Sequence, residues 1–333
     1  MTAHRDLLAL PKGHLHLHLE GAMRPSTLAE LAATHGIDVP PIRGFKSFTA
    51  FAGMYAAACA VLATEADLRR LVREVVEDAA DDGVTWLEPS FYSPRHQSAF
   101  GSNEAAIEIV LDELAAAGNA CGIGTGLIIA ADRTEDPAES STLATIAVSL
   151  AERGVVGFGL ANDEANWPPG PFAAAFAVAV DGGLMSVPHG GELSGPESVV
   201  GCIEDCRAAR VMHGVRAVES PDLVAHLAER GICLDVCPTS NVLLGVVPTL
   251  EAHPLPALLD AGVRCSVNAD DPLLFGPGVL DEYRLCRDRI GLDDTRLARV
   301  ARCSLEDSAA PRGLVAAGVA AIDAWLAAAP GPA

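Results

Sequence analysis

Four ionisable side chains alternate with leucines near the start of the chain: His14, His16, His18 and Glu20. In an extended strand successive side chains point to opposite faces, so these four share one face and the leucines take the other. Imidazoles at this spacing can bind a single cation. The alternative is a set of hydrogen-bonded polar residues that fill a core, but three histidines on an otherwise apolar strand favour a metal site.

Three further polar groups come directly after apolar segments. They are His189-Gly-Gly-Glu192, His213-Gly and Asn268-Ala-Asp270-Asp271. Each has a plain structural interpretation as a turn or a helix cap. If the apolar segments are strands of a barrel, all three groups lie at the C-terminal strand ends, where barrel enzymes hold their active sites. Their joint placement therefore predicts one shared site.

One catalytic zinc ion per chain would account for this combination. Such an ion needs three or four nitrogen and oxygen ligands and an open position for water, which then ionises near neutral pH. The candidate ligands are His16, His18, His189 and Asp270. Glu192 is the candidate general acid, provided that burial keeps it protonated. His213 and Asp271 are candidates to orient the hydroxide and the substrate.

Apolar segments bounded by turn residues alternate with amphipathic helical patterns along the whole chain. The predicted strands are His14–Leu19, Val84–Phe91, Gly122–Ala130, Val155–Leu160, Leu184–His189, Arg210–His213, Cys233–Val236 and Arg264–Asn268. Strands that alternate with helices pair in parallel. Eight such units favour an α/β fold of the closed (β/α)8 TIM-barrel type, as in metal-dependent hydrolases, over an open sheet.

The segment between the first two strands, residues 22–82, is long for one crossover and rich in aromatic and small residues. It predicts extra helices that cap the barrel mouth. We expect a single catalytic domain over residues 8–326, with this cap included, because no linker or repeat divides the chain. Residues 327–333 are Ala- and Pro-rich and are expected to form a frayed tail.

The composition narrows the function further. The formal net charge is -21, which argues against nucleic acid and anionic membranes as partners. The only lysines are Lys12 and Lys46. Two-metal barrel hydrolases commonly bridge their ions with a modified lysine on a middle strand, so a site for one ion is expected. The nine cysteines and the lack of a secretory pattern favour reduced thiols and a cytoplasmic protein.

At this point the chain resembles the adenosine/AMP deaminase family of barrel metallohydrolases. The resemblance extends from Pro11 to about Gly276 and rests on five blocks in the family's order. They are PKGHLHLHLEGA at 11–22, HGGE at 189–192, HG at 213–214, CPTSN at 237–241 and SVNADDPLLFG at 266–276. Each block alone is modest, whereas the set is specific.

The resemblance implies hydrolytic deamination of a 6-aminopurine on one zinc ion. The family's zinc ligands match His16, His18, His189 and Asp270. Glu192 matches the acid that protonates the ring nitrogen beside the amino-bearing carbon, and His213 matches the histidine that orients the hydroxide. Asp271 matches the carboxylate that contacts the water and the imidazole edge of the purine. His18, which faces the same pocket, is also expected to contact the substrate.

This sequence departs from the family pattern at positions that bear on the choice of substrate. Adenosine deaminases usually have an aspartate at position 20, where it helps to hold the ribose. This chain has Glu20 there, as adenine deaminases do. Asn162 replaces a glycine near the N3 edge of the purine, and the strand-two motif, Phe91 to Pro94, lacks its arginine. Glu20 and Asn162 are therefore both candidate substrate contacts.

These observations favour a zinc-dependent deaminase of adenosine or a related 6-aminopurine. Adenine and modified adenosines remain open as substrates, and AMP is disfavoured because the acidic chain offers few bases for a phosphate. A catalytically silent purine-binding relative and a hydrolase of a non-purine heterocycle are the other hypotheses. In each purine hypothesis the partner is a small nucleoside or base. The oligomeric state stays open.

Overall fold

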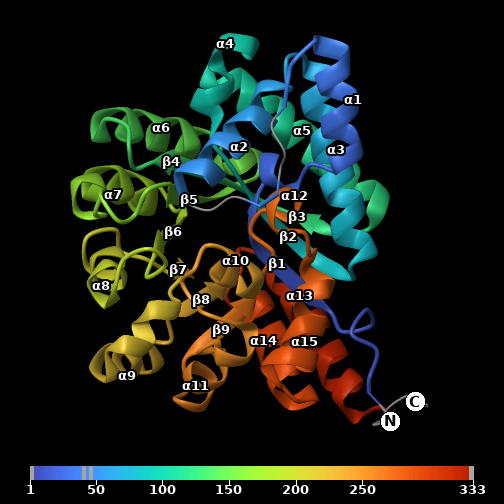
Figure 1. Cartoon of the computed structure of the whole chain (residues 1–333), viewed down its shortest axis with the longest axis vertical. Helices are drawn as coiled ribbons and strands as arrows, with labels where there is room; N and C mark the ends of the chain where they lie inside the picture. The colour runs from blue at the N-terminus through green and yellow to red at the C-terminus, as the bar shows by residue number, and fades with distance from the viewer. Residues whose placement is uncertain (1–3, 40–42, 45–47, 330–333) are drawn as a thin grey trace.

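The computed structural model describes residues 4–39, 43–44 and 48–329, and its centre is a ring of parallel strands (Figure 1). The hydrogen-bonded path follows chain order: β1 (Lys12–His18), β2 (Val84–Phe91), β4 (Leu127–Asp132), β5 (Val155–Ala161), β6 (Met185–Gly190), β7 (Arg210–His213), β8 (Cys233–Val236) and β9 (Arg264–Val267). Helices surround this ring. The predicted (β/α)8 barrel is confirmed.

The ring is closed by backbone contacts between β1 and the segment that follows β9. The amide of His18 donates to the carbonyl of Asp270 at 3.0 Å, and the amide of Asp270 donates to the carbonyl of His16 at 3.1 Å. The side chain of Asn268 accepts from the amide of Leu15 at 2.7 Å. Two predicted metal ligands of the first strand are thereby held in register with a third after the last strand.

The third predicted strand, Gly122–Ala130, is wrong at both ends. Gly122 is instead the left-handed cap (φ 73°) of helix α5 (Asn103–Cys121). The extended chain is then divided at Gly126 into the short β3 (Gly124–Thr125) and the longer β4. A Cβ at Gly126 would lie 2.7 Å from the side chain of Val156, so strand packing here requires glycine. Apolar residues occur both before and after Gly126, so the sequence pattern did not indicate that the strand is divided there.

Most of the surrounding helices follow the strands in turn. They are α3 (Glu65–Asp81), α5, α6 (Pro137–Ser149), α7 (Ala173–Asp181), α8 (Pro196–Glu204), α9 (Pro221–Arg230), α11 (Leu255–Asp260), α13 (Val279–Leu285), α14 (Asp294–Glu306) and α15 (Arg312–Ala327). α3 shows why these segments are helical. A reciprocal capping box between Thr64 and Asp67 begins it, and Leu68, Leu71 and Val75 form its buried stripe.

Two additional helices, α1 (Pro25–His35) and α2 (Phe48–Ala60), lie between β1 and β2, as the cap prediction requires. Residues 40–42 and 45–47 of this segment lie outside the described residues. α2 is apolar around its circumference because it packs on one side and lines the pocket at the barrel mouth on the other. The ring of Phe51 stacks on Phe275 of the short helix α12 (Pro272–Phe275), with centroids 5.3 Å apart. This contact joins the cap to the loop after β9.

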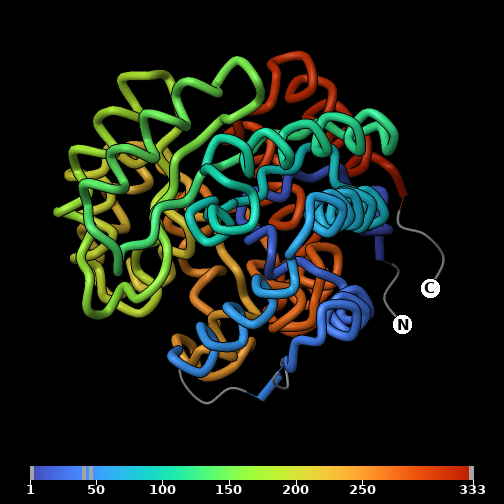
Figure 2. Tube along the Cα trace, turned by 90° about the horizontal axis from the view of Figure 1, so that it is seen from above, coloured from blue at the N-terminus to red at the C-terminus, as the bar shows by residue number. Residues whose placement is uncertain are grey.

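The first and last described segments lie side by side, as the view from above shows (Figure 2). Arg5 donates to the carbonyls of Leu326 and Ala328. α15 continues to Ala327, and residues 330–333 lie outside the described part, so the frayed tail expected over residues 327–333 stays a prediction. The side chain of Trp325 packs into the core.

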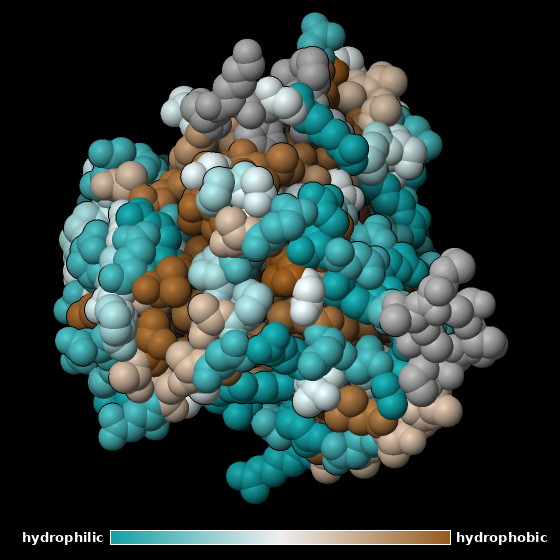
Figure 3. Space-filling model, turned by 60° about the horizontal axis from the view of Figure 1, so that its bottom comes forward, coloured by the Kyte–Doolittle hydropathy of each residue, from teal (hydrophilic) through white to brown (hydrophobic). Residues whose placement is uncertain are grey.

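Hydrophilic residues cover most of the face in Figure 3, in keeping with the acidic composition. Within the described ranges, no single helix has both the length and the apolar composition needed to cross a membrane. α2 and α3 meet that criterion only when they are taken together, across a bend of 118°.

Candidate active site

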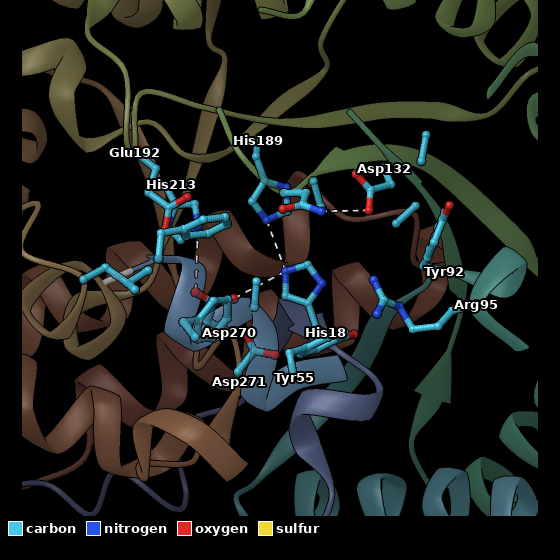
Figure 4. Close-up of a pocket in the computed structure, with 18 residues that line it drawn as sticks. His18, Tyr55, Tyr92, Arg95, Asp132, His189, Glu192, His213, Asp270 and Asp271 are labelled. Carbon is cyan, nitrogen blue, oxygen red and sulfur yellow. Dashed lines mark hydrogen bonds and ion pairs between the residues drawn. The ribbon is translucent and has the colours of Figure 1, made fainter. Parts of the chain in front are cut away.

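The predicted site residues gather around one pocket at the C-terminal ends of the strands (Figure 4). Seven of the predicted residues line it directly: His18, Asn162, His189, Glu192, His213, Asp270 and Asp271. Two predicted residues do not line it. His16 lies fully buried beneath the other imidazoles, and Glu20 is fully buried on the side of α2.

The four predicted metal ligands form a compact cluster. The Nε2 atoms of His18 and His189 are 3.2 Å apart. Asp270 Oδ1 lies 3.4 Å from Nε2 of His16 and 3.4 Å from Nε2 of His18. Two ligands at ~2.0–2.1 Å on one tetrahedral ion are separated by roughly 3.3 Å, which is close to these distances. The cluster therefore has the dimensions of a site for one cation.

An unsatisfied polar atom supports the same assignment. Nε2 of His16 is buried and makes no hydrogen bond. The other nitrogen of His16, Nδ1, lies 3.0 Å from the carbonyl oxygen of Asp235 and must donate to it. This leaves a lone pair on His16 Nε2, directed at the cluster, which is the arrangement usual for a metal-binding imidazole. A buried lone pair without a donor has a natural partner in a cation.

The backbone is strained where it presents these side chains. Asn162, His213 and Asp270 all have left-handed backbone conformations, with φ of 83°, 64° and 63°. Residues other than glycine rarely adopt this region, and such strain tends to collect at functional sites. At the ends of β5 and β7 and after β9, the strained residue turns the chain away from the barrel while its own side chain lines the pocket.

Glu192 lies on the pocket wall beside this cluster, in the loop after β6. Its Oε1 is 3.4 Å from Nε2 of His213, and its side chain is almost completely buried. Burial, reinforced by the nearby negative charges of Asp270 and Glu164, raises the pKa of Glu192 well above its usual value. A carboxyl group with a raised pKa keeps its proton to higher pH than an ordinary glutamate does, so it can serve as a proton donor.

Asp271 occupies the opposite wall. Burial and the adjacent charge of Asp270 raise the pKa of Asp271 well above its usual value. Its Oδ1 makes no hydrogen bond. A Cβ at Gly21 would lie 1.6 Å from that oxygen, so Asp271 can take this position only because residue 21 is glycine. The first block and the last block of the family pattern thus interlock directly.

The two residues that depart from the family pattern have different surroundings. The carboxylate of Glu20 interacts with His96 at 2.7 Å and accepts from the hydroxyl of Tyr55 at 2.8 Å. Its predicted contact with substrate stays a prediction. Asn162 lines the pocket, and its Nδ2 donates to Asp132 Oδ2 at 2.8 Å. The side chain of Asn162 is therefore held in one orientation against the wall.

Several pocket residues were not predicted from the sequence. They are Tyr92, Arg95 and Asp132 on the outer wall, with Tyr55 contributed by the cap. Asp132 is the last residue of β4, so the strand-end criterion would have found it had the strand been placed correctly. Arg95 comes directly after the strand-two motif Phe91 to Pro94, but nothing in its spacing showed that it would turn towards the pocket.

Comparisons with known proteins agree with this geometry. The family model described as adenosine deaminase matches residues 11–324. The chain belongs to the adenosine deaminase family. It is 45% identical to a putative adenosine/adenine deaminase of Streptomyces virginiae, over 97% of this chain and 98% of that one. An adenine deaminase of a Chelativorans species is 36% identical, over 89% and 93%.

Solved structures place this adenosine deaminase family member among enzymes of the same fold. The adenine deaminase of Arthrobacter aurescens superimposes with a TM-score of 0.89 at 30% identity, covering 96% of this chain and 99% of that one. A zinc-bound amidohydrolase from Burkholderia ambifaria gives a TM-score of 0.86 at 26% identity, covering 96% and 93%. The chain is therefore a purine aminohydrolase with a candidate metal site.

Proposed function

We propose that the chain hydrolyses the C6 amino group of adenosine or a related 6-aminopurine in a zinc-dependent reaction. The products are the 6-oxopurine and ammonia, so one water is consumed. The observation that carries the proposal is the position of Glu192, a buried carboxyl group with a raised pKa, beside the cluster of three histidines and Asp270. We assign the activity to one domain, residues 8–326.

His16, His18, His189 and Asp270 would hold the ion. A zinc ion in that position would supply the acidity that makes water a nucleophile near neutral pH. His16 suits this role because its Nδ1 is committed to Asp235 and its Nε2 is bare. Three imidazoles and one carboxylate also form a donor set typical of zinc. A modified-lysine bridge for a second ion has no candidate after Lys46 in the sequence.

Side chains of the pocket would carry out the proton transfers and orient the attacking water. Glu192 donates its proton to the ring nitrogen beside C6, which makes that carbon more electrophilic. His213 and Asp271 lie on either side of Asp270 and contact the attacking water. As the tetrahedral carbon collapses, the amino group takes one proton of the attacking water and leaves as ammonia. The other proton of that water returns to Glu192 and restores the acid. Burial of all three groups excludes bulk water and strengthens each of these interactions.

The outer pocket defines the substrate class. Aromatic side chains of the cap, Phe48, Phe51 and Tyr55, offer faces for a flat ring. Asp132 and Asn162 provide polar groups at the opposite wall. A purine fits this combination of stacking surface and hydrogen-bonding edge. Adenine and modified adenosines are the alternative substrates, because Glu20 and Asn162 depart from the adenosine pattern.

The deciding experiment measures ammonia release across adenine, adenosine, AMP and N6-substituted adenosines. We expect turnover of at least one neutral 6-aminopurine and the weakest turnover for AMP. Binding of a purine without ammonia release from any of these compounds would instead support a catalytically silent relative. Release from a non-purine heterocycle alone would contradict the purine assignment.

A further inference from the structure

A chain of buried hydrogen bonds extends from His213 away from the pocket. Nδ1 of His213 lies 3.2 Å from Nδ2 of Asn241, and Oδ1 of Asn241 lies 3.2 Å from Nε2 of His253. Nδ1 of His253 in turn lies 3.1 Å from the backbone amide of Leu255. The three side chains are at most 4% exposed. This series of hydrogen bonds therefore links the end of β7 to the N-terminus of α11 through the core.

The backbone amide of Leu255 determines the direction of every bond in this chain. An amide N–H can only donate, so Nδ1 of His253 must accept and carries no proton. Burial lowers the pKa of His253 to about 4, which keeps the ring neutral with its proton on Nε2. That N–H must donate to Asn241, which identifies the facing atom as the amide oxygen.

The same logic then reaches His213. With its oxygen turned to His253, Asn241 presents its NH2 group to Nδ1 of His213. Nδ1 must therefore accept, and the neutral imidazole has its proton on Nε2. The opposite arrangement would place two donors face to face at a buried position and leave both without an acceptor, which is strongly unfavourable. Nε2 of His213 is the atom that faces Glu192 and Asp270.

We propose that Asn241 and His253 are positioning residues that hold His213 in its Nε2-protonated tautomer. His213 then meets the attacking water as a hydrogen-bond donor and not as the base that removes its proton. This inference rests on the proposed function for its consequence, but the tautomer itself is a property of the folded chain. Asn241 lies in α10 (Pro238–Leu243), and His253 lies two residues before the start of α11.

The direct test is nitrogen-15 NMR of the zinc-loaded protein with labelled histidines. The His213 signals are assigned by their absence in His213→Asn. We expect the shifts of a protonated Nε2 and a bare Nδ1 in the unaltered protein. In Asn241→Asp, whose carboxylate can only accept, we expect the proton on Nδ1. A bare Nε2 in the unaltered protein would overturn the proposal, and this result does not depend on whether the protein deaminates purines.

Kinetics provides the second measurement. Asn241→Asp has almost the same shape as the original residue, and we expect kcat to fall about 10²-fold with a smaller change in KM. Asn119→Asp makes the same chemical change on the exposed face of α5 and should leave both constants unaltered. A kcat for Asn241→Asp close to that of Asn119→Asp would contradict the proposed role.

His253 allows a rescue experiment. His253→Gln retains an N–H donor for Asn241, whereas His253→Leu does not. We expect the leucine variant to lose kcat roughly tenfold or more and the glutamine variant to recover most of it. Equal losses in two folded variants would show that His253 only fills space. If the leucine variant does not fold, the test is the nitrogen-15 NMR of His213 in His253→Gln. We expect the proton to stay on Nε2 in that variant, and a proton on Nδ1 would contradict the proposal.

Discussion

The carboxylate of Glu164 holds the backbone of Glu192. Its Oε2 accepts from the amide of Glu192 at 3.0 Å, and also from the amides of Leu193 and Ser194 at 2.6 and 3.0 Å. Its Oε1 accepts from the amide of Gly191 at 2.6 Å. One buried acid from the loop after β5 thus satisfies four consecutive amides after β6. The proposed proton donor is positioned through its main chain, which leaves its side chain free to face the pocket.

Glu164→Gln should destabilise this loop. The glutamine oxygen can replace Oε2, but its NH2 group would then face the amide of Gly191 without an acceptor. A buried amide without a partner costs about 1–3 kcal/mol, so we expect a lower Tm and a kcat reduced about tenfold. Thermal unfolding and steady-state kinetics measure the two effects. Glu204→Gln, exposed on α8, is the matched control. An unchanged Tm would contradict the role of Glu164.

Glu192→Gln should remove the proton donor while it preserves the shape of the site. We expect kcat to fall at least ~10²-fold with the metal content unchanged, because Glu192 is outside the proposed ligand set. Kinetics combined with elemental analysis separates the two effects. Turnover close to that of the unaltered enzyme would exclude Glu192 as the general acid.

The raised pKa of Glu192 predicts the alkaline side of the pH profile. The neutral acid is the active form and predominates below its pKa, so kcat/KM should decrease tenfold per pH unit as pH rises above that value. The negative charge of Glu164 contributes to the raised pKa. Glu164→Gln should therefore move the alkaline limb to lower pH. The measurement is kcat/KM against pH for both proteins, and an identical limb would argue that another group titrates.

Asn162→Gly should change substrate preference more than metal content. The substitution removes a pocket side chain, releases Asp132 from its hydrogen bond and relieves a left-handed residue of its strain. We expect relative kcat/KM values across adenine, adenosine and N6-substituted analogues to shift about tenfold. An unchanged ranking of substrates would show that Asn162 does not contact the substrate.

Metal analysis tests the proposed ligand set. We expect about one zinc ion per chain in the purified protein, and a large loss of zinc in His189→Asn. His226→Asn, on α9 and outside the pocket, should retain the metal. Two tightly bound ions per chain, or full zinc content in His189→Asn, would contradict the single site described above.

The sequence alone was sufficient to predict the barrel and the convergence of the site. Both follow from local patterns, since alternating strands and helices imply a parallel barrel and the C-terminal strand ends of a barrel meet at one face. His189 and His213 could be assigned to that face because each lies at the end of an apolar segment. The third strand was misplaced because a glycine break, such as that at Gly126, leaves the apolar pattern intact.

Only the tertiary structure showed how distant side chains act on one another. His96 and Tyr55 contact Glu20, Glu164 binds the backbone amide of Glu192, and Asn241 lies within hydrogen-bond distance of His213. The partners in each of these pairs are at least 28 residues apart in the sequence. Hydrogen-bond direction and burial depend on the packed three-dimensional surroundings. Residue types and spacing therefore predicted which chemistry the chain could carry, and packing decided which partners and how much burial surround each group.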